Sequence, residues 1–200
     1  PQNAGPKMET LSQVMCSICN DSGWVSHKVP LGHPDFGQAF PCGCQKERLN
    51  KRLQVALERF AQLPKANDLP KTFDSFKVVA GAEEAYLAAQ AYAENPFQVP
   101  ILVFRGVRGC GKTHLLEAIG HRLLERGIVC RYAVGPDLMD ELRASYSEES
   151  GDNFEAVFDR YRHTTVLLLD DPGAERTTLW TIEKMYQLIN DRIVRGQGKG

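Results

Sequence analysis

The sequence lacks an excess of charge, a long apolar run and a secretion signal. Its 200 residues carry 24 Lys and Arg against 25 Asp and Glu, which excludes a chain-wide basic coat for nucleic acid. The longest apolar runs, such as Val99–Phe104, have the length of a strand and are too short to span a bilayer. The first ten residues show no basic and then apolar pattern of a secretion signal. We therefore expect a cytoplasmic protein, and its 42% apolar residues exclude wholesale disorder.

Six cysteines are present, and four of them gather near the start of the chain. This quartet consists of Cys16, Cys19, Cys42 and Cys44. Disulfides are not expected in the cytoplasm, whereas four thiolates match tetrahedral Zn²⁺ in a closed structural site. Residues 14–44 are rich in turn-forming residues and poor in large aliphatic ones, so their fold needs such a metal.

Other chemistries for the quartet stay open. His27 or His33 could replace one thiolate, although a complete set of four cysteines is already there. Four thiolates also suit an iron–sulfur cluster. A redox dithiol of this spacing usually belongs to a compact βαβ fold, which residues 14–44 do not indicate. Zinc is favoured and iron remains an alternative.

Residues Gln45–Leu63 are predicted to form an amphipathic helix. Its apolar stripe consists of Leu49, Leu53, Ala56, Leu57, Phe60 and Leu63. The outer face has three positive charges in excess, which suits either a solvated surface or a contact with a partner or nucleic acid. Residues 64–76 contain two prolines and no periodicity, so we expect a linker between a module at 1–63 and a domain at 77–200.

After the linker, predicted helices and strands alternate. Helices are expected at Ala82–Glu94, Lys112–Arg126, Pro136 to about Tyr146, Phe154–Tyr161 and about Thr178–Arg195, and strands at Val99–Arg105, Ile128–Val134 and Thr165–Asp170. The buried stripe of the last helix is expected to consist of Leu179, Ile182, Met185, Tyr186 and Ile189. This alternation predicts an α/β fold with a parallel sheet sandwiched by helices.

A phosphate-binding loop lies between the first of these strands and the helix that follows it. The residues Gly106, Val107, Arg108, Gly109, Cys110, Gly111, Lys112 and Thr113 match G-x-x-x-x-G-K-[ST] at every fixed position. Such glycines let consecutive backbone amides point at phosphate oxygens, next to the positive end of a helix. We expect Lys112 to reach the β- and γ-phosphates, Thr113 to bind Mg²⁺ and Cys110 to point away. A chance match is disfavoured by the order of strand, loop and helix.

A second acidic motif follows the strand at 165–170. The run Val166–Leu169 ends in Asp170 and Asp171, which a parallel sheet delivers to the edge that carries the phosphate loop. We expect Asp170 to hold Mg²⁺ and Asp171 to orient and deprotonate the attacking water. The alternative is a plain Asp-Asp-Pro-Gly turn. Paired acids after an aliphatic strand favour ATP hydrolysis over a small-molecule kinase.

These motifs together resemble one family. The phosphate loop with His114-Leu115, then Pro136-Asp137-Leu138, the tract from Leu167 to Arg176 and Tyr186–Arg192 closely resemble helicase loaders of the DnaC and DnaI type, whose ATPase domain IstB-type transposition helpers share. The resemblance implies an AAA+ ATPase with His114 at the nucleotide site. It further implies oligomerisation with ATP and placement of a replicative helicase on single-stranded DNA, with the zinc module and basic helix contacting the helicase.

The sequence departs from that family at two points. The first is Asp171, which stands where the family often has Glu. Separately, Arg176 is a candidate for contact with phosphate or with a neighbouring subunit. The family's sensor strand and arginine finger have no match before Gly200, so we expect a longer protein in which 99–105 and 165–170 do not pair directly. A transposition helper, or a nucleotide-switch adaptor with little hydrolysis, remains an alternative.

Overall fold

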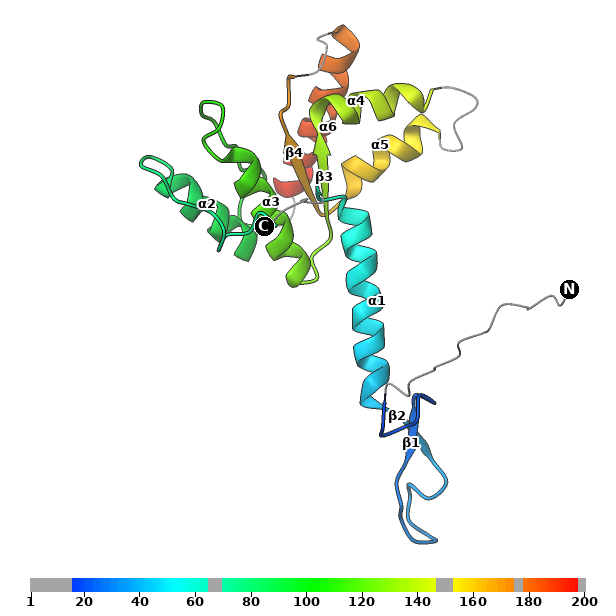
Figure 1. Ribbon diagram of the computed structural model, residues 1–200. Helices are drawn as coiled ribbons and strands as arrows, with labels where there is room; N and C mark the ends of the chain where they lie inside the picture. The colour runs from blue at the N-terminus through cyan, green and yellow to red at the C-terminus, as the bar shows by residue number, and fades with distance from the viewer. Residues whose placement is uncertain (1–15, 65–69, 147–152, 175–177, 198–200) are drawn as a thin grey trace, which may run out of the picture. The chain divides into compact units, whose positions relative to one another are not determined.

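The structure is a computed structural model that describes residues 16–64, 70–146, 153–174 and 178–197 (Figure 1). The chain forms two compact units, one up to Leu53 and one from Gln54, and we describe each by itself. Arg176 and the flanking residues 175 and 177 lie outside the described ranges, as do 65–69 of the predicted linker. Within these ranges, no helix has the length and apolar character needed to cross a membrane.

The first unit is a small hairpin followed by the start of a helix. Strands β1 (Trp24–Ser26) and β2 (Ala39–Pro41) pair antiparallel, with Val25 opposite Phe40. The helix α1 (Gly43–Ala61) begins directly after β2. Among the described residues of this unit, only Cys19, Gly23 and Cys42 are buried. Strands of three residues are too short to show an alternating apolar pattern, so this hairpin was not predicted from the sequence.

The predicted amphipathic helix is confirmed as α1, but its stripe is buried only in part. Leu57 and Ala61 are buried in the core of the second unit. Leu53 and Leu49, one and two turns before Leu57, are 55% and 67% exposed. The helix therefore has an anchored end and an end whose apolar side chains face solvent.

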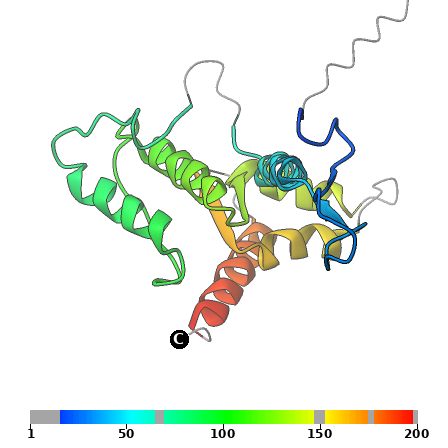
Figure 2. The ribbon, with the colours of Figure 1, turned by 90° about the horizontal axis from the view of Figure 1, so that it is seen from below.

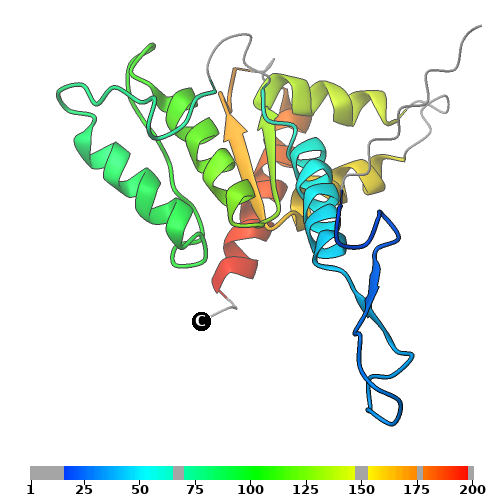
Figure 3. The same ribbon diagram turned by 60° about the horizontal axis from the view of Figure 1, so that its bottom comes forward.

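The core of the second unit is a two-stranded parallel sheet between helices. Strand β3 (Cys130–Val134) pairs with β4 (Val166–Asp170), with Cys130 opposite Val166. On one face lie α2 (Glu83–Glu94) and α3 (Lys112–Glu125). On the other lie α4 (Gly135–Ala144), α5 (Phe154–His163) and α6 (Leu179–Gln197). From below, α3 and α6 lie on opposite sides of β4 (Figure 2), and the paired strands are seen in Figure 3. The predicted parallel arrangement is confirmed.

Local signals explain where several of these elements start. Pro136 lies in the first turn of α4, where its missing N–H costs no helical hydrogen bond. The side chain of Asn153 caps α5 by accepting a hydrogen bond of 2.8 Å from the Ala156 amide. Such cues are readable in the sequence, and the five predicted helices of this unit appear close to their expected bounds.

Two predictions for this unit are wrong. Residues 99–105 form no strand, because the described residues offer them no hydrogen-bonding neighbour. The predicted stripe of α6 is also misplaced. Leu179, Ile182 and Tyr186 are 88%, 55% and 68% exposed, whereas Leu188 is fully buried. Apolar side chains occur on both sides of α6, and packing against α5 and β4 selects the side that carries Leu188.

Candidate nucleotide site and cysteine cluster

The phosphate loop turns into α3 through glycines with left-handed backbone conformations. Gly109 has φ 78° and Gly111 has φ 95°, values that residues with a Cβ rarely adopt. At Gly111 a side chain is also excluded by contact, since an added Cβ would lie 2.7 Å from a ring carbon of Phe76. These two positions of the motif therefore need glycine for geometric reasons.

Lys112 folds back onto this loop. Its Nζ donates hydrogen bonds to the carbonyl oxygens of Gly106, at 3.1 Å, and Val107, at 2.9 Å. The Cys110 thiol, which was expected to point away, lies 3.9 Å from the same Nζ, and a Cβ at Gly106 would be 2.9 Å from its sulfur. The Lys112 ammonium group is therefore held by the carbonyls of its own loop. A bound phosphate chain would compete with these two carbonyls for the ammonium group.

Residues 72–76, predicted to be linker, pack against the start of α3. His114 Nε2 lies 2.9 Å from the Thr72 carbonyl oxygen and 3.2 Å from Ser75 Oγ. The His114 ring meets Phe76 edge to face at 5.1 Å, and Phe76 stacks on Tyr86 of α2 at 5.6 Å. His114, predicted to be at the nucleotide site, therefore joins the loop to this aromatic segment. Phe73 and Phe76 are two aromatic residues within the predicted linker, and they could have indicated that this segment packs against the domain.

A half-buried ion pair joins α3 to the segment before residue 72. Lys71 Nζ lies 2.6 Å from Glu117 Oε1, and Glu117 is only 2% exposed. A buried carboxylate without a cation would be strongly destabilising. The pair joins the segment before the aromatic residues to the helix that carries Lys112 and Thr113. Nothing in the local sequence predicts this contact, since 46 positions separate its partners.

Of the two predicted acids, Asp170 ends β4 and Asp171 follows it directly. The Asp171 amide donates to Asp170 Oδ1 at 3.1 Å, and the Tyr132 hydroxyl donates to Asp170 Oδ2 at 2.7 Å. Asp171 has φ 45°, a left-handed conformation that turns the chain sharply after the strand. Burial, followed by the bond to Asp170, raises the pKa of the Tyr132 phenol. Tyr132 was missed by the sequence analysis because its partner lies on another strand.

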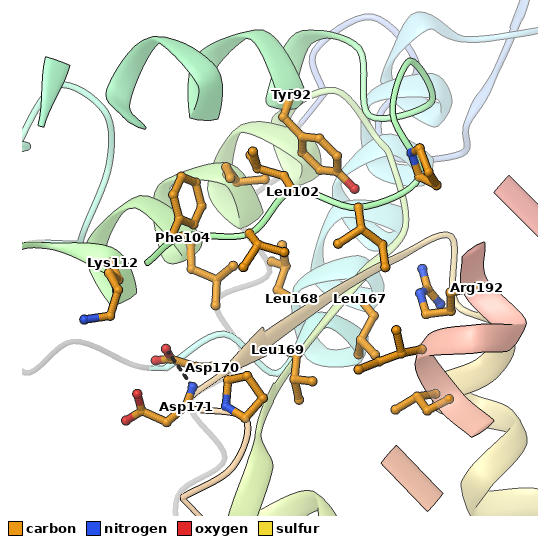
Figure 4. A pocket seen from close by; sticks show the side chains of 18 residues that line it. Tyr92, Leu102, Phe104, Lys112, Leu167, Leu168, Leu169, Asp170, Asp171 and Arg192 are labelled. Atoms are coloured by element: carbon orange, nitrogen blue, oxygen red, sulfur yellow. Dashed lines mark hydrogen bonds between the residues drawn. The ribbon is translucent and has the colours of Figure 1, made fainter. Parts of the chain in front are cut away.

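A cavity of about 310 Å³ brings Lys112 and both acids together (Figure 4). Residues 101–104 line one side and 167–171 the other. Lys112 and the carboxylates lie at one end, while Tyr92 and Arg192 lie toward the other. The segment before the phosphate loop and β4 thus face each other across open space. This agrees with the expectation that they do not pair directly.

The four cysteines of the first unit converge on one point. Their sulfur atoms all lie within 4.8 Å of one another, and no other such group of metal-binding side chains occurs in the described part of the chain. Cys16 Sγ is 3.8 Å from Cys42 Sγ, and Cys19 Sγ is 3.4 Å from Cys44 Sγ. Tetrahedral zinc with bonds of about 2.3 Å requires sulfurs about 3.8 Å apart. The donor set fits a zinc ion.

The surroundings of the cluster lower the pKa of one of these thiols and raise the pKa of two others. Burial opposes ionisation of Cys19, but the Gly23 amide, 3.4 Å from its sulfur, and the neighbouring thiols lower its pKa to about 7. The hydrogen bond to Cys19, then burial, raises the pKa of Cys44 to about 12. His27 and His33 instead contact Asp35, so within the described residues neither histidine belongs to the quartet.

Comparison with known proteins identifies the second unit. Residues 68–193 match the model of the bacterial DnaA ATPase domain. The chain belongs to this family. It is 35% identical over 127 residues to the chromosomal replication initiator protein DnaA of Nautilia profundicola, a match that covers 60% of this chain and 28% of that protein.

A solved structure agrees with this assignment. Domain III of the replication initiation protein DnaA from Thermotoga maritima superposes with a TM-score of 0.58 at 27% identity, covering 66% of this chain and 55% of that one. The chain therefore spans under a third of one DnaA relative and about half of the other chain. The predicted AAA+ P-loop fold and the prediction of an ATPase are confirmed. These comparisons assign the chain to the DnaA ATPase-domain family, and they do not show the predicted loader of the DnaC and DnaI type.

Proposed function

We propose that this chain binds and hydrolyses ATP in order to place a replicative helicase on single-stranded DNA during replication initiation. The observation that carries the proposal is the cavity that Lys112, Asp170 and Asp171 share at one end, in a member of the DnaA ATPase family. A cation and two carboxylates at the carboxyl edge of a parallel sheet suit a polyphosphate with its metal.

Each predicted residue has a role in this proposal. The amides of residues 106–113, with His114 beside them, surround the phosphates, and Lys112 leaves the loop carbonyls to bind the β- and γ-phosphates. Thr113 and Asp170 would hold Mg²⁺, which neutralises charge on the phosphates when bound. Asp171 orients and deprotonates the attacking water. Its side chain is exposed, so solvent reaches it directly.

We further propose that Cys16, Cys19, Cys42 and Cys44 bind one structural zinc ion. The sulfur distances support this, and so does the near absence of other buried residues in the first unit. Binding energies near ~10–16 kcal/mol for structural zinc are sufficient to hold such a unit without a core. A closed set of four thiolates leaves no position for catalysis.

Exposed apolar side chains of the first unit favour a protein partner. Ile18, Trp24, Leu31 and Phe36 are between 51% and 85% exposed, and α1 adds Leu49 and Leu53. Basic residues flank these leucines along α1. We propose that this surface contacts the helicase, that the second unit contacts single-stranded DNA and that the protein oligomerises with ATP.

The test is ATP turnover by the whole chain with and without single-stranded DNA. Lys112→Ala should lower turnover at least a hundredfold, because no other ammonium lines the described cavity. Lys77→Ala, which removes an exposed lysine outside the cavity, should have no effect. Equal turnover in the wild type and Lys112→Ala would leave the nucleotide-switch adaptor as the better proposal, which the short side chain of Asp171 favours.

The partner requires its own experiment. A pull-down with the cognate replicative helicase should retain this chain, with retention that depends on ATP. Removing the apolar contact through Leu49→Asp and Leu53→Asp together should abolish retention, and the matched exposed control Asn50→Asp should preserve it. Retention by a transposase instead of the helicase would favour the transposition helper.

A further inference from the structure

Tyr132 connects the middle of β3 to the acidic end of β4. Parallel pairing places Tyr132 opposite Leu168, so its side chain leaves the sheet on the same face as Leu168 and Asp170. The ring belongs to the buried cluster that includes Leu115 and Ile119 of α3, and only 6% of the residue is exposed. Its hydroxyl reaches diagonally along the sheet to Asp170 Oδ2 at 2.7 Å.

The Asp170 carboxylate is held through both of its oxygens. The phenol donates to Oδ2, and the Asp171 amide donates to Oδ1 at 3.1 Å. Two donors on different oxygens fix both torsions of the side chain, whereas the amide alone leaves the carboxylate free to tilt. Each oxygen retains a lone pair, so the carboxylate can still accept bonds from water or a metal.

A second tyrosine makes the same kind of bond away from the cavity. The Tyr161 hydroxyl donates to a carboxylate oxygen of Glu141, and Tyr161 is 2% exposed. Neither residue lines the cavity that holds Lys112 and Asp170. The two pairs share their chemistry and their burial, and differ in whether the carboxylate belongs to the candidate nucleotide site.

We propose that Tyr132 is a positioning residue, whose hydroxyl holds Asp170 in the orientation that receives the divalent metal of the bound nucleotide. This inference rests on the proposed function. Preorganised groups cost no reorganisation when the ligand binds. Loss of the hydroxyl therefore weakens metal binding and slows hydrolysis, while the phosphate loop still binds the nucleotide.

The experiment replaces each tyrosine with phenylalanine in the full chain. Tyr132→Phe should weaken Mn²⁺ binding about tenfold in the complex with a non-hydrolysable ATP analogue, as measured by electron paramagnetic resonance. It should lower kcat by a similar factor and leave KM for ATP within twofold. Tyr161→Phe should change neither Mn²⁺ affinity nor kcat. In an Asp170→Asn background, Tyr132→Phe should have no further effect on Mn²⁺ binding.

Several results would overturn the inference. These are unchanged Mn²⁺ affinity in Tyr132→Phe, equal losses in the two tyrosine variants, a full additional loss in the Asp170→Asn background, or no Mn²⁺ binding by the wild-type complex. Weaker Mn²⁺ binding in Tyr132→Phe, together with a wild type that hydrolyses no ATP, would support the positioning role and refute the proposed hydrolysis. The two proposals are thereby tested separately.

Discussion

The two units of this chain are held together in different ways. In the described part of the first unit, two of the three buried residues are cysteines, and their sulfurs belong to the cysteine quartet. The second unit buries two clusters of aliphatic and aromatic side chains, one on each face of its sheet. Apolar burial therefore holds the second unit, whereas the first unit has to rely on its thiol cluster.

This contrast shows how size limits the means of stabilisation. A short segment cannot remove enough apolar surface from water to offset the loss of chain entropy, while a larger domain can. Helix α1 shows both regimes in one element, since Leu57 is buried in the core of the second unit and Leu49 is exposed. Because the two units are stabilised by different means, each should respond independently to a change in the other.

Metal removal should have the largest effect and be confined to the first unit. Chelation, or Cys42→Ala, should unfold residues 16–44, because structural zinc contributes about 10–16 kcal/mol of apparent binding energy. Hydrogen exchange should show lost protection there and unchanged protection in α3 and β4. Cys130→Ala, which removes a cysteine outside the quartet, should keep one metal per chain. Metal analysis of the wild type without zinc or iron would rule out a metal site.

Removing buried side-chain volume from the core of the second unit should destabilise that unit and leave the first unit unchanged. Leu142 of α4 is fully buried, so Leu142→Ala should reduce the free energy of unfolding of this unit by about 2–5 kcal/mol. Denaturant melts would measure the loss. Metal content and exchange protection at residues 16–44 should match the wild type, and coupled loss in both units would contradict their independence. Leu87→Ala, at an exposed position on α2, is the matched control.

Breaking the half-buried ion pair between Lys71 and Glu117 should reduce the free energy of unfolding by less. Lys71→Met leaves the Glu117 carboxylate buried without its cation and should destabilise the second unit by about 1–3 kcal/mol, as seen in thermal melts. We place the loss below that of a fully buried pair because Lys71 is 42% exposed. Adding Glu117→Gln should recover part of the stability. A double variant as unstable as the single one would show that packing, and not charge, is responsible.

The smallest predicted effect concerns the anchored end of α1. The Arg131 guanidinium lies between the rings of Phe60, 4.7 Å away, and Tyr161, 5.0 Å away. Arg131 is 5% exposed, and in the described structure its Nε and Nη1 have no hydrogen-bond partner. Phe60→Leu keeps an apolar side chain but loses the cation–π contact, so stability should fall by about 1 kcal/mol in denaturant melts. An unchanged denaturant midpoint would show that the contact with Tyr161 is enough to stabilise the buried Arg131 guanidinium.

Much of the second unit could be predicted from the sequence because its signals are local. The phosphate loop is a run of eight residues that matches every fixed position of the motif, and its glycines at 109 and 111 have positive φ. The bounds of α4 and α5 followed from Pro136 and from apolar spacing. The cysteine quartet was predicted from identity and spacing, and the structure brings all four sulfurs together.

Contacts between distant parts of the chain could not be predicted in this way. The bond from Tyr132 to Asp170 depends on the register of two strands, and the pair Lys71–Glu117 joins a presumed linker to a helix. The buried side of α6 was decided by its neighbours, since apolar residues occur on both sides. Residues 99–105 have strand-like composition, but a strand requires a paired neighbour.

The sequence by itself determined which residues have the chemistry that a phosphate, a magnesium or a zinc site requires, because that chemistry depends on residue type and close spacing. Only the tertiary structure decided how those residues are supported, since packing and strand register bring together groups that lie far apart in the chain.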